Sequence, residues 1–539
     1  MPFKKTPLLI CLLWAFLVIL SLTSRSFFPI DETRYATVAW NMWQSGDYLV
    51  PTLNGATYSH KPPLLFWLMN LGWAVFGIND WWPRLIPSLF ALASVFITRK
   101  IASLLWPNQP NIKDNASFIL IGSGLWVIYS TALMFDMLIA FFTVLGIWAL
   151  LLAYKTQSFK AWLLFTIAIG GGLLAKGPTI LLQLLPVALL VHFWNKNPKQ
   201  KLDAKNWYLP ILYSILGGAF IALIWAIPAG IHGGAQYQHD IFWGQTANRM
   251  VNSFAHKRPI WWYTAILPLL LFPWLLLGSF WRGLFKNNSI WQENSVRFCL
   301  AWLVPVFIAF SFISGKQVHY VLPLLPTFAL IIARVISINE TVARRDLLPI
   351  CIAFTALGVA LLFLPYYAKS HGVSVANWVN LPLWLGFFAI IIGVTIFFFS
   401  TKIASNVVAW LSASSIALIS IAMFVLIQTA GDAYDIRPIS YKVKALQAAN
   451  VPVAFLGKYA GTYDFVGRLK QAPDSVESDT VLAWFEAHPN GRVITFFKRN
   501  NTPSQAGFTQ DYKGKVIAVL NYDEWLKHDA AEQTNSDTP

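Results

Sequence analysis

Acidic residues are scarce in this chain, and a few of them lie where a carboxylate needs an explanation. Asp and Glu together account for 24 of 539 residues. Asp136 ends one apolar run and begins the next, and a carboxylate inside such sequence is by default a functional candidate, with a helix cap as the structural alternative. Asp31 and Glu32 open another helical pattern, where capping and compensation of the helix dipole are the alternatives. Carboxylates can accept a proton or stabilise developing positive charge.

Basic residues also lie in short connections between apolar runs. Lys176 sits in Ala175-Lys176-Gly177-Pro178, and Lys316 sits in Ser314-Gly315-Lys316-Gln317. Any one of them is explained by a long side chain that extends its charge to the membrane surface. Several at one face would instead form a pocket for the phosphate oxygens of an anionic headgroup. The set comprises Arg34, Lys61, Lys176, Arg249, Lys257, Arg258 and Lys316.

Histidines give a weaker signal. The four near the same face are His60, His239, His256 and His319, and their spacing is not that of a metal site. If a divalent cation is bound, we expect Asp31, His60 and Asp136 to hold it. The sequence contains no phosphate-binding glycine loop and no nucleophile elbow.

The elements that carry these residues are apolar helices. Hydrophobic residues make up 56% of the chain and charged residues 12%, whereas about a quarter of the residues of soluble proteins are charged. This composition excludes a soluble globular protein, a disordered chain and a disulfide scaffold. The net charge of +16 suits loops that face anionic lipid rather than nucleic acid. The sequence therefore predicts an α-helical polytopic membrane protein.

Apolar runs of roughly 20 residues, each long enough to cross a bilayer, recur along the chain. We expect about thirteen spans, near residues 7–28, 84–105, 116–134, 137–154, 161–175, 178–194, 209–229, 261–281, 297–314, 319–338, 347–367, 381–400 and 406–428. Alternate loops are rich in Lys and Arg, which predicts a cytoplasmic N-terminus. An odd number of spans then predicts that everything after about residue 430 lies outside the cytoplasm.

The outer segments are long enough to fold. In the first outer loop, about 29–83, we expect two interfacial helices, one from Asp31 to Gly46 and one from Leu64 to Phe76. The second, 230–259, resembles a lid or binding loop. The expected division is a transmembrane domain over 1–430, a small α/β domain over 431–528 with strands near 451–456, 492–497 and 515–520, and a disordered tail over 529–539.

Several short motifs follow one another along the chain. They are Asp31-Glu32-Thr33-Arg34-Tyr35-Ala36, Ser45-Gly46-Asp47, Lys61-Pro62-Pro63, Asp136, Ala175-Lys176-Gly177, Phe242-Trp243, Asn248-Arg249, His256-Lys257-Arg258-Pro259, Trp262-Tyr263 and Ser314-Gly315-Lys316 with Tyr320. Through these motifs the chain resembles the bacterial ArnT-like aminoarabinose transferases. That family lies within the membrane glycosyltransferase superfamily of GT-C fold, which includes the protein O-mannosyltransferases.

The resemblance implies an enzyme of the bacterial inner membrane. Such an enzyme moves 4-amino-4-deoxy-L-arabinose or a related sugar, with inversion, from undecaprenyl phosphate to a periplasmic-face acceptor such as a lipid A phosphate. It implies that Asp31 is the key carboxylate and that Asp136 assists. The substrate-binding residues it implies are Glu32, Arg34, Tyr35, His60, Lys61, Lys176, Arg249, Lys316 and Tyr320. A divalent cation is the one cofactor left open, and the expected partners are the two lipid-linked substrates and membrane lipids, not nucleic acid.

The sequence leaves other functions open. His60 stands where the family commonly has glutamate, and Thr246 where it has histidine, so mannosyl or hexosyl transfer to protein or another envelope glycan is an alternative. From the residues alone, a flippase for lipid-linked sugars is a second alternative, which predicts broken helices and charges at mid-membrane. A non-catalytic scaffold is a third.

Overall fold

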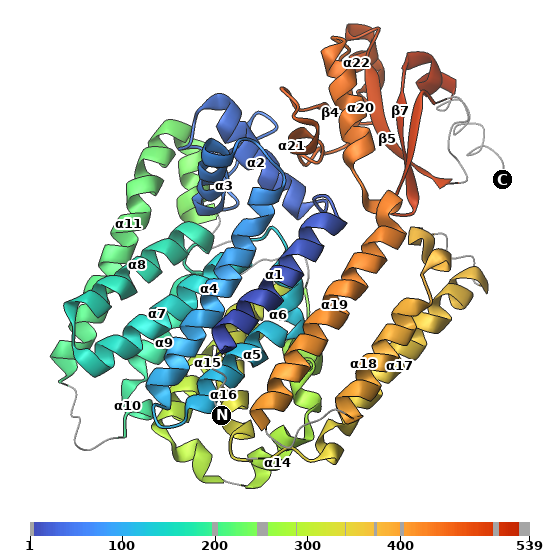
Figure 1. The fold of residues 1–539 in the computed structure, drawn as a ribbon. Helices are drawn as coiled ribbons and strands as arrows, with labels where there is room; N and C mark the ends of the chain where they lie inside the picture. Colours follow the sequence, from blue (N-terminus) through green and yellow to red (C-terminus); the bar gives the residue numbers. More distant parts are fainter. Residues whose placement is uncertain are drawn as a thin grey trace.

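The computed structural model describes residues 5–196, 203–244, 257–286, 288–339, 341–370, 375–398, 404–499 and 506–527. A bundle of long helices forms one part of it, and a small sheet with its own helices covers one end of that bundle (Figure 1). The expected tail 529–539, together with Arg249, Thr246 and His256, lies outside the described residues. The fold class predicted from the sequence is confirmed.

Nine helices of the described residues are long and apolar enough to cross a membrane, judged by length and composition. Six of them are α1 (Thr6–Ser24), α4 (Trp81–Leu105), α7 (Asp136–Thr156), α8 (Phe159–Lys176), α11 (Ala204–His239) and α15 (Asn294–Phe312). The others are η4 with α16 (Val318–Leu324 and Leu325–Ile336), α17 (Arg344–Ser370) and α19 (Ala404–Tyr434). The chain is a multi-pass membrane protein.

The remaining four expected spans are short or interrupted. Segment 116–134 divides at Ser123 into α5 (Pro110–Gly122) and α6 (Gly124–Tyr129). Segment 178–194 divides at Leu190 into α9 (Thr179–Leu189) and α10 (Val191–Trp194).

Segment 261–281 falls into α13 (Trp262–Leu270), η2 (Trp274–Leu276) and α14 (Gly278–Lys286), and α18 (Trp384–Phe398) has 15 residues. Proline explains the break before η2, because Pro273 has no N–H to continue a helix. Unbroken spans at these three places were therefore a wrong expectation, and the total of thirteen stays a prediction.

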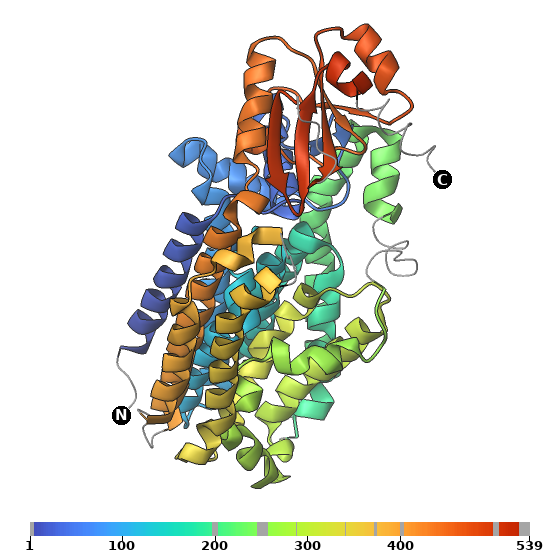
Figure 2. The ribbon, with the colours of Figure 1, turned by 90° about the vertical axis from the view of Figure 1, so that its right-hand side faces the viewer.

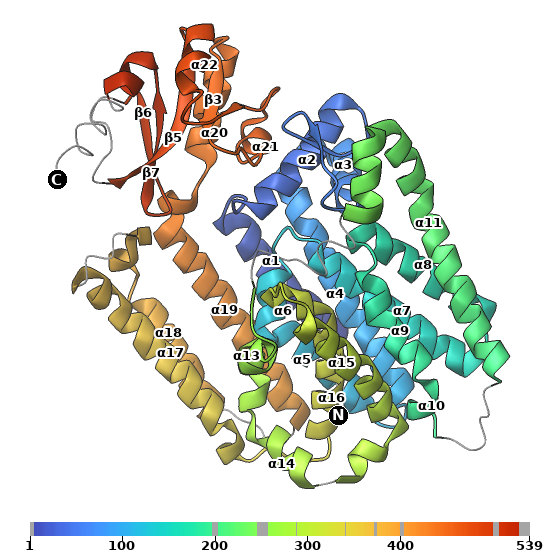
Figure 3. The ribbon, with the colours of Figure 1, turned by 180° about the vertical axis from the view of Figure 1, so that it is seen from behind.

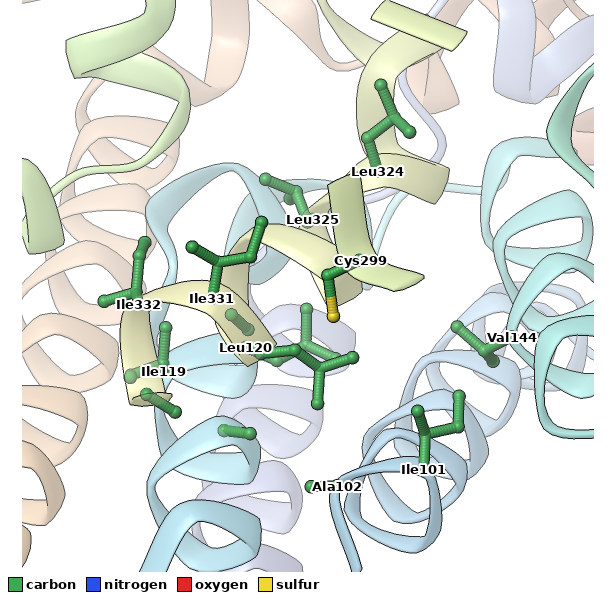
Figure 4. Packing of buried hydrophobic residues seen from close by; sticks show 14 of the residues in the cluster. Ile101, Ala102, Ile119, Leu120, Val144, Cys299, Leu324, Leu325, Ile331 and Ile332 are labelled. Atoms are coloured by element: carbon green, nitrogen blue, oxygen red, sulfur yellow. The ribbon is translucent and has the colours of Figure 1, made fainter. Parts of the chain in front are cut away.

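The bundle is held by a continuous apolar core. Leu120 of α5, Cys299 of α15 and Ile331 of α16 are buried in it, with Ile101 of α4 and Val144 of α7 on its other side (Figure 4). Figure 3 shows the bundle from behind, with α17 and α18 packed as a hairpin beside α19. This core fixes where the helix ends lie at the sheet-covered end.

The first outer loop contains the two expected helices. They are α2 (Asp31–Ser45), which ends at Gly46 with a φ of 71°, and α3 (Leu64–Phe76). A short hairpin of β1 (Thr52–Leu53) and β2 (Ala56–Thr57) connects them. In the second outer loop, α11 breaks at Gly234, whose φ of 85° is not helical, and the helix then resumes as far as His239. The π-helical turn η1 (Asp240–Gly244) follows it, and a lid or binding loop over 230–259 stays a prediction.

The C-terminal sheet has five strands in the order β4-β3-β5-β7-β6. These are β3 (Val453–Leu456), β4 (Asp474–Val476), β5 (Arg492–Lys498), β6 (Phe508–Tyr512) and β7 (Lys515–Leu520). β3 pairs parallel with β4 and β5, whereas β7 pairs antiparallel with β5 and β6.

Three helices accompany the sheet, α20 (Arg437–Ala448), α21 (Asp464–Gly467) and α22 (Val481–Ala487). Figure 2 shows this sheet unit above the same end of the bundle as α2 and α3. The three expected strands are confirmed. The boundary at 431 stays a prediction, and α19 continues as helix to Tyr434.

Candidate functional site

A buried ion pair joins two neighbouring helices at the sheet-covered end of the bundle. α7 begins at Asp136 and α8 ends at Lys176, and Lys176 Nζ lies 2.5 Å from Asp136 Oδ1. The side chain of Asp136 is 4% exposed. The helix cap is Phe135 and no side chain caps it, so capping does not explain Asp136. Gly177, at a φ of 71°, lets the chain turn directly after Lys176.

Aromatic side chains surround this pair. Lys176 Nζ lies 4.9 Å from the centroid of the Tyr320 ring, which belongs to η4. His319 is its neighbour, and the His319 ring lies 5.5 Å from that of Tyr129. The face of an aromatic ring attracts a cation, so Tyr320 helps to hold the ammonium group in place.

Lys61 reaches the same place from the segment before α3. Its Nζ lies 5.8 Å from the centroid of the Phe135 ring, next to Asp136. Lys61 and His319 lie close enough to Asp136 to interact electrostatically with its carboxylate. Three basic groups from three elements, Lys61, Lys176 and His319, therefore face one buried carboxylate.

Asp31 and Tyr35 bring α2 to this cluster. The Asp31 side chain is 56% exposed, and its closest basic partner is Arg34 at 3.8 Å. Tyr35, one turn later, is buried, and its ring meets the edge of Phe135 at 5.0 Å. Burial raises the pKa of Tyr35 well above its ordinary value, and the charges of Asp31 and Asp136 raise it further.

We call the group of Asp31, Tyr35, Lys61, Asp136, Lys176, His319 and Tyr320 the Asp136 cluster. The charge of Asp31 also acts on His319, which ties the exposed carboxylate to the buried pair. The sequence named six of these seven residues as site candidates. It mentioned His319 only as a histidine without metal spacing, and its contact with Tyr129 depends on packing between η4 and α6 that no local pattern shows.

His60 is one of the three residues named for the case that a divalent cation is bound. His60 stacks on Tyr58 at 5.2 Å between ring centroids. Among the described residues, no three side chains of His, Cys, Asp or Glu gather closely enough to hold a metal ion. That Asp31, His60 and Asp136 would hold a cation, if one is bound, stays a prediction.

The carboxylate of Glu32 is held by contacts within the protein. Its carboxylate binds the Arg25 guanidinium at 2.5 and 2.8 Å and accepts the amides of Phe28 and Leu133, each at 2.8 Å. Burial alone would raise the pKa of Glu32, but Arg25 and the two amides outweigh it, so the pKa is lowered. These contacts occupy the carboxylate, which argues against the expected contact with substrate.

Arg25 is a residue that the sequence reasoning missed. It fell inside the expected span 7–28, but α1 ends at Ser24 and Arg25 is extended. Its guanidinium also donates to the carbonyl of Thr131. Arg25 and Glu32 thus fix the segment that leads into α2 against the start of α7.

Lys316 is also an internal anchor. It is 3% exposed, and its Nζ donates to the carbonyls of Ile313 at 2.6 Å and Arg258 at 2.9 Å. An isolated bridge between Lys257 and Gly315 adjoins it. Lys316 therefore holds two loops together, rather than presenting its charge to a ligand as expected.

The cluster combines two opposite electrostatic features. One carboxylate, Asp31, is open to solvent, while Lys61 and Lys176 lie near a second carboxylate that is buried. Such a site can stabilise a cationic centre on one side and a phosphate that gains negative charge on the other. It suits the breaking of a bond between a carbon and a phosphate oxygen.

Comparisons with known proteins agree with this chemistry. The family model for dolichyl-phosphate-mannose-protein mannosyltransferase matches residues 60–230. The undecaprenyl phosphate-alpha-4-amino-4-deoxy-L-arabinose arabinosyl transferase of Pectobacterium atrosepticum is 29% identical over 417 residues, which cover 72% of this chain and 71% of that protein.

Solved structures show the same fold. ArnT from Cupriavidus metallidurans in the apo state superposes with a TM-score of 0.73 at 15% identity, covering 95% of this chain and 97% of that one. The structure of the same protein bound to undecaprenyl phosphate gives a TM-score of 0.71 at 14% identity, covering 96% and 98%. The likeness extends over the bundle and the sheet unit together.

Proposed function

We propose that this chain, an ArnT-like membrane protein with the GT-C fold, is a glycosyltransferase that takes a sugar from undecaprenyl phosphate and transfers it with inversion. The observation that carries the proposal is the Asp136 cluster, in which Lys61 and Lys176 lie beside a buried carboxylate and Asp31 is exposed nearby. Similarity to an undecaprenyl phosphate-aminoarabinose transferase, and to a solved structure with bound undecaprenyl phosphate, supports this donor.

In this proposal Lys61 and Lys176 bind the phosphate of the donor. The bond between sugar C1 and the phosphate oxygen breaks, and the phosphate leaves with the electron pair. The leaving group gains negative charge in the transition state, which the two ammonium groups stabilise. Asp136 is a positioning residue, because its ion pair sets where the Lys176 ammonium lies.

Asp31 acts on the opposite side of the sugar. If the acceptor is a hydroxyl, Asp31 accepts its proton as the acceptor oxygen bonds to C1. If the acceptor is an ionised phosphate, no proton moves, and Asp31 stabilises the positive charge on the sugar. Its open position at the start of α2 suits either role.

The name of the Pectobacterium relative supports the sugar, and the acceptor rests on the resemblance in sequence motifs alone. We propose 4-amino-4-deoxy-L-arabinose as the sugar and a lipid A phosphate as the acceptor, at the periplasmic face of the inner membrane. A hexose and a different envelope acceptor are the alternative, favoured by the family-model match to a mannosyltransferase. Glu32 and Lys316 are held by internal contacts, so we propose that they build the site, while Arg34, His60 and Arg249 remain candidates for substrate binding.

Mass spectrometry of the envelope tests the function. Lipid A, other glycans and glycopeptides are compared between cells with the chain, cells without it, and cells with Asp31→Asn. Asp511→Asn is the matched control, because Asp511 is also exposed and paired with an arginine but lies on the sheet unit. We expect loss of a pentosamine from lipid A in the deletion and in Asp31→Asn, and none in the control.

The other outcomes are equally informative. Loss of a hexose from another acceptor would keep the enzyme class and replace the proposed substrates. Full activity of Asp31→Asn, expressed at the wild-type level, would contradict the role of that carboxylate. We expect Asp31→Asn to lower the rate by about 100-fold or more, because the variant loses the charge that stabilises the sugar cation.

A further inference from the structure

A cavity of about 770 Å³ lies at the sheet-covered end of the bundle, apart from the Asp136 cluster. Its wall is formed by the ends of α1, α4 and α19, by the start of α20 and by Trp378 of η5 (Val375–Asn380). No member of the Asp136 cluster lines it. Arg25 does line it, so the Arg25–Glu32 pair stands between the cavity and the segment leading to Asp136.

The wall is apolar on one side and charged on the other. Leu22 lies in the last turn of α1, and Leu426 and Ile427 lie about two turns before the end of α19. Both helices are candidate spans. Arg25 and Arg437 lie just beyond the ends of those helices. The apolar part of the wall thus lies within the spans, where lipid tails lie, and the arginines lie beyond the spans, where lipid headgroups lie.

Most charged side chains on the wall have a partner of opposite charge in the part of the chain that the structure describes, but one does not. Arg25 pairs with Glu32, and Arg437 pairs with Asp435 at 2.7 Å. Asp80, also on the wall, pairs with Arg468 at 2.5 Å. Arg84 has no carboxylate within 4.0 Å among the described residues.

Arg84 is the unusual member of this wall. It is 4% exposed, and its two terminal nitrogens donate to the carbonyls of Ser21, Leu22 and Arg25 at the end of α1. Its Nε is buried without a hydrogen-bond partner within the described part of the chain. Capping α1 explains the terminal nitrogens but leaves the Nε–H without an acceptor in the described ranges. The guanidinium charge has no carboxylate in direct contact in these ranges, and Glu32 and Asp80 act on it only from a greater distance.

We propose that this cavity binds the phosphate headgroup of an anionic membrane lipid, with its acyl chains against α1 and α19. A phosphate in the cavity places negative charge close to Arg84 and Arg25 on the wall, and Arg437 at the rim adds a further contact. The apolar wall favours a lipid over a free anion, because acyl chains can pack against it and a free anion cannot. This site is separate from the donor site and does not rest on the proposed function.

Gly431 offers a way to fill the cavity without disturbing the fold. It lines the cavity within α19, and a Cβ added there would meet no atom within 4 Å. Gly431→Leu therefore projects a side chain into the open space, and leucine is a better helix former than glycine. Gly507→Leu is the matched control, since a Cβ there meets only the Glu524 carboxylate at 3.8 Å and Gly507 does not line the cavity.

The experiment titrates the full detergent-solubilised chain with short-chain phosphatidylglycerol and counts bound lipid by native mass spectrometry. Phosphatidylcholine, diacylglycerol and inorganic phosphate are titrated in parallel. A photoactivatable phosphatidylglycerol then identifies the labelled peptides. We expect one retained phosphatidylglycerol, labelling near 378 and 426–437, and at least tenfold weaker binding for Gly431→Leu and for Arg437→Gln.

The controls decide the interpretation. Gly507→Leu and Arg499→Gln, which removes an exposed and paired arginine on the sheet unit, should bind as the wild type does. Unchanged binding in Gly431→Leu would overturn the site. Binding of inorganic phosphate as strong as that of phosphatidylglycerol would overturn the assignment to a lipid, and equal binding of diacylglycerol would overturn the role of the arginines.

Discussion

At the scale of single residues, the Asp136–Lys176 pair is the centre of the site. Both side chains are largely withdrawn from solvent, and each neutralises the other. A buried pair adds little net stability, but removing one partner leaves a buried charge without compensation. Stability and catalysis can therefore be separated by comparing single and double substitutions.

We predict that Asp136→Asn destabilises the protein by about 3–5 kcal/mol and abolishes sugar transfer, because Lys176 loses its counter-charge. The double variant Asp136→Leu/Lys176→Met should regain the thermal stability of the wild type and still fail to transfer sugar. Melting temperature in detergent and transfer rate are the two measurements. A double variant that recovers transfer would show that the pair is structural only.

A second buried carboxylate, Asp464 in the sheet unit, predicts a dependence of stability on pH. Burial raises the pKa of Asp464 to about 7, and the hydroxyl of Tyr459, which donates at 2.8 Å, only partly opposes that rise. The folded state therefore holds a proton that the unfolded state releases above about pH 4. The stabilising contribution is complete below that pH and is lost as pH rises through 7.

Asp464→Asn should remove this dependence. Relative to the variant, the wild type should lose up to about 4 kcal/mol between pH 4 and pH 8, as a shift of about three pKa units requires. Melting temperatures of the two proteins, measured from pH 5 to pH 8, should diverge as pH rises, with the variant the more stable at pH 8. Parallel pH profiles would contradict the assignment.

At the scale of elements, α2 is held from two sides. It packs against α3 of the bundle and against α21 of the sheet unit. Thr37 Oγ1 donates to the carbonyl of Gly461 at 2.8 Å, and Trp40 Nε1 donates to the carbonyl of Leu469 at 2.9 Å. The helix that begins with Asp31 is thus positioned by residues more than 400 positions away in the chain.

Gly461 tests this positioning. Its φ is 69°, and a Cβ would lie 2.7 Å from Leu53 and 3.0 Å from Thr37. We predict that Gly461→Val separates α21 from α2 and lowers transfer at least tenfold. Gly457→Val is the control, since Gly457 also has a positive φ, 88°, but open space around it. The two variants share the backbone strain, so equal losses of activity would exclude a role for the docking contact.

Local patterns were sufficient to predict some elements of the site. Asp31 and Gly46 delimit α2, Gly77 follows α3, and the glycine after Lys176 ends α8. The same patterns could not show that Glu32 binds Arg25 or that Lys316 donates to two backbone carbonyls. Both contacts depend on segments that meet only in the folded chain. The breaks within long apolar runs were not predicted, because the sequence stays apolar on both sides of each break.

At the scale of the whole molecule, the question is what keeps the sheet unit on the bundle. One candidate is the ion pair between Arg468 and Asp80, but Asp80 is half exposed, and such pairs contribute about 1 kcal/mol or less. The other is an apolar cluster shared by α2, α3 and the sheet unit. Phe465 is buried in it, stacked on Trp73 at 4.9 Å and against the edge of Phe27 at 5.3 Å.

The free energies involved favour the apolar cluster around Phe465 over the ion pair. We therefore predict that Phe465→Ala releases the sheet unit and that Asp80→Asn does not. Truncating a buried phenylalanine costs about 3–5 kcal/mol, several times the value of the exposed ion pair. Hydrogen exchange in α2 should rise in Phe465→Ala, together with loss of transfer. Phe485→Ala is the matched control, because Phe485 is equally buried but lies in the separate core of the sheet unit. If Phe485→Ala raised exchange in α2 as much as Phe465→Ala, general unfolding of the unit rather than undocking would be the cause.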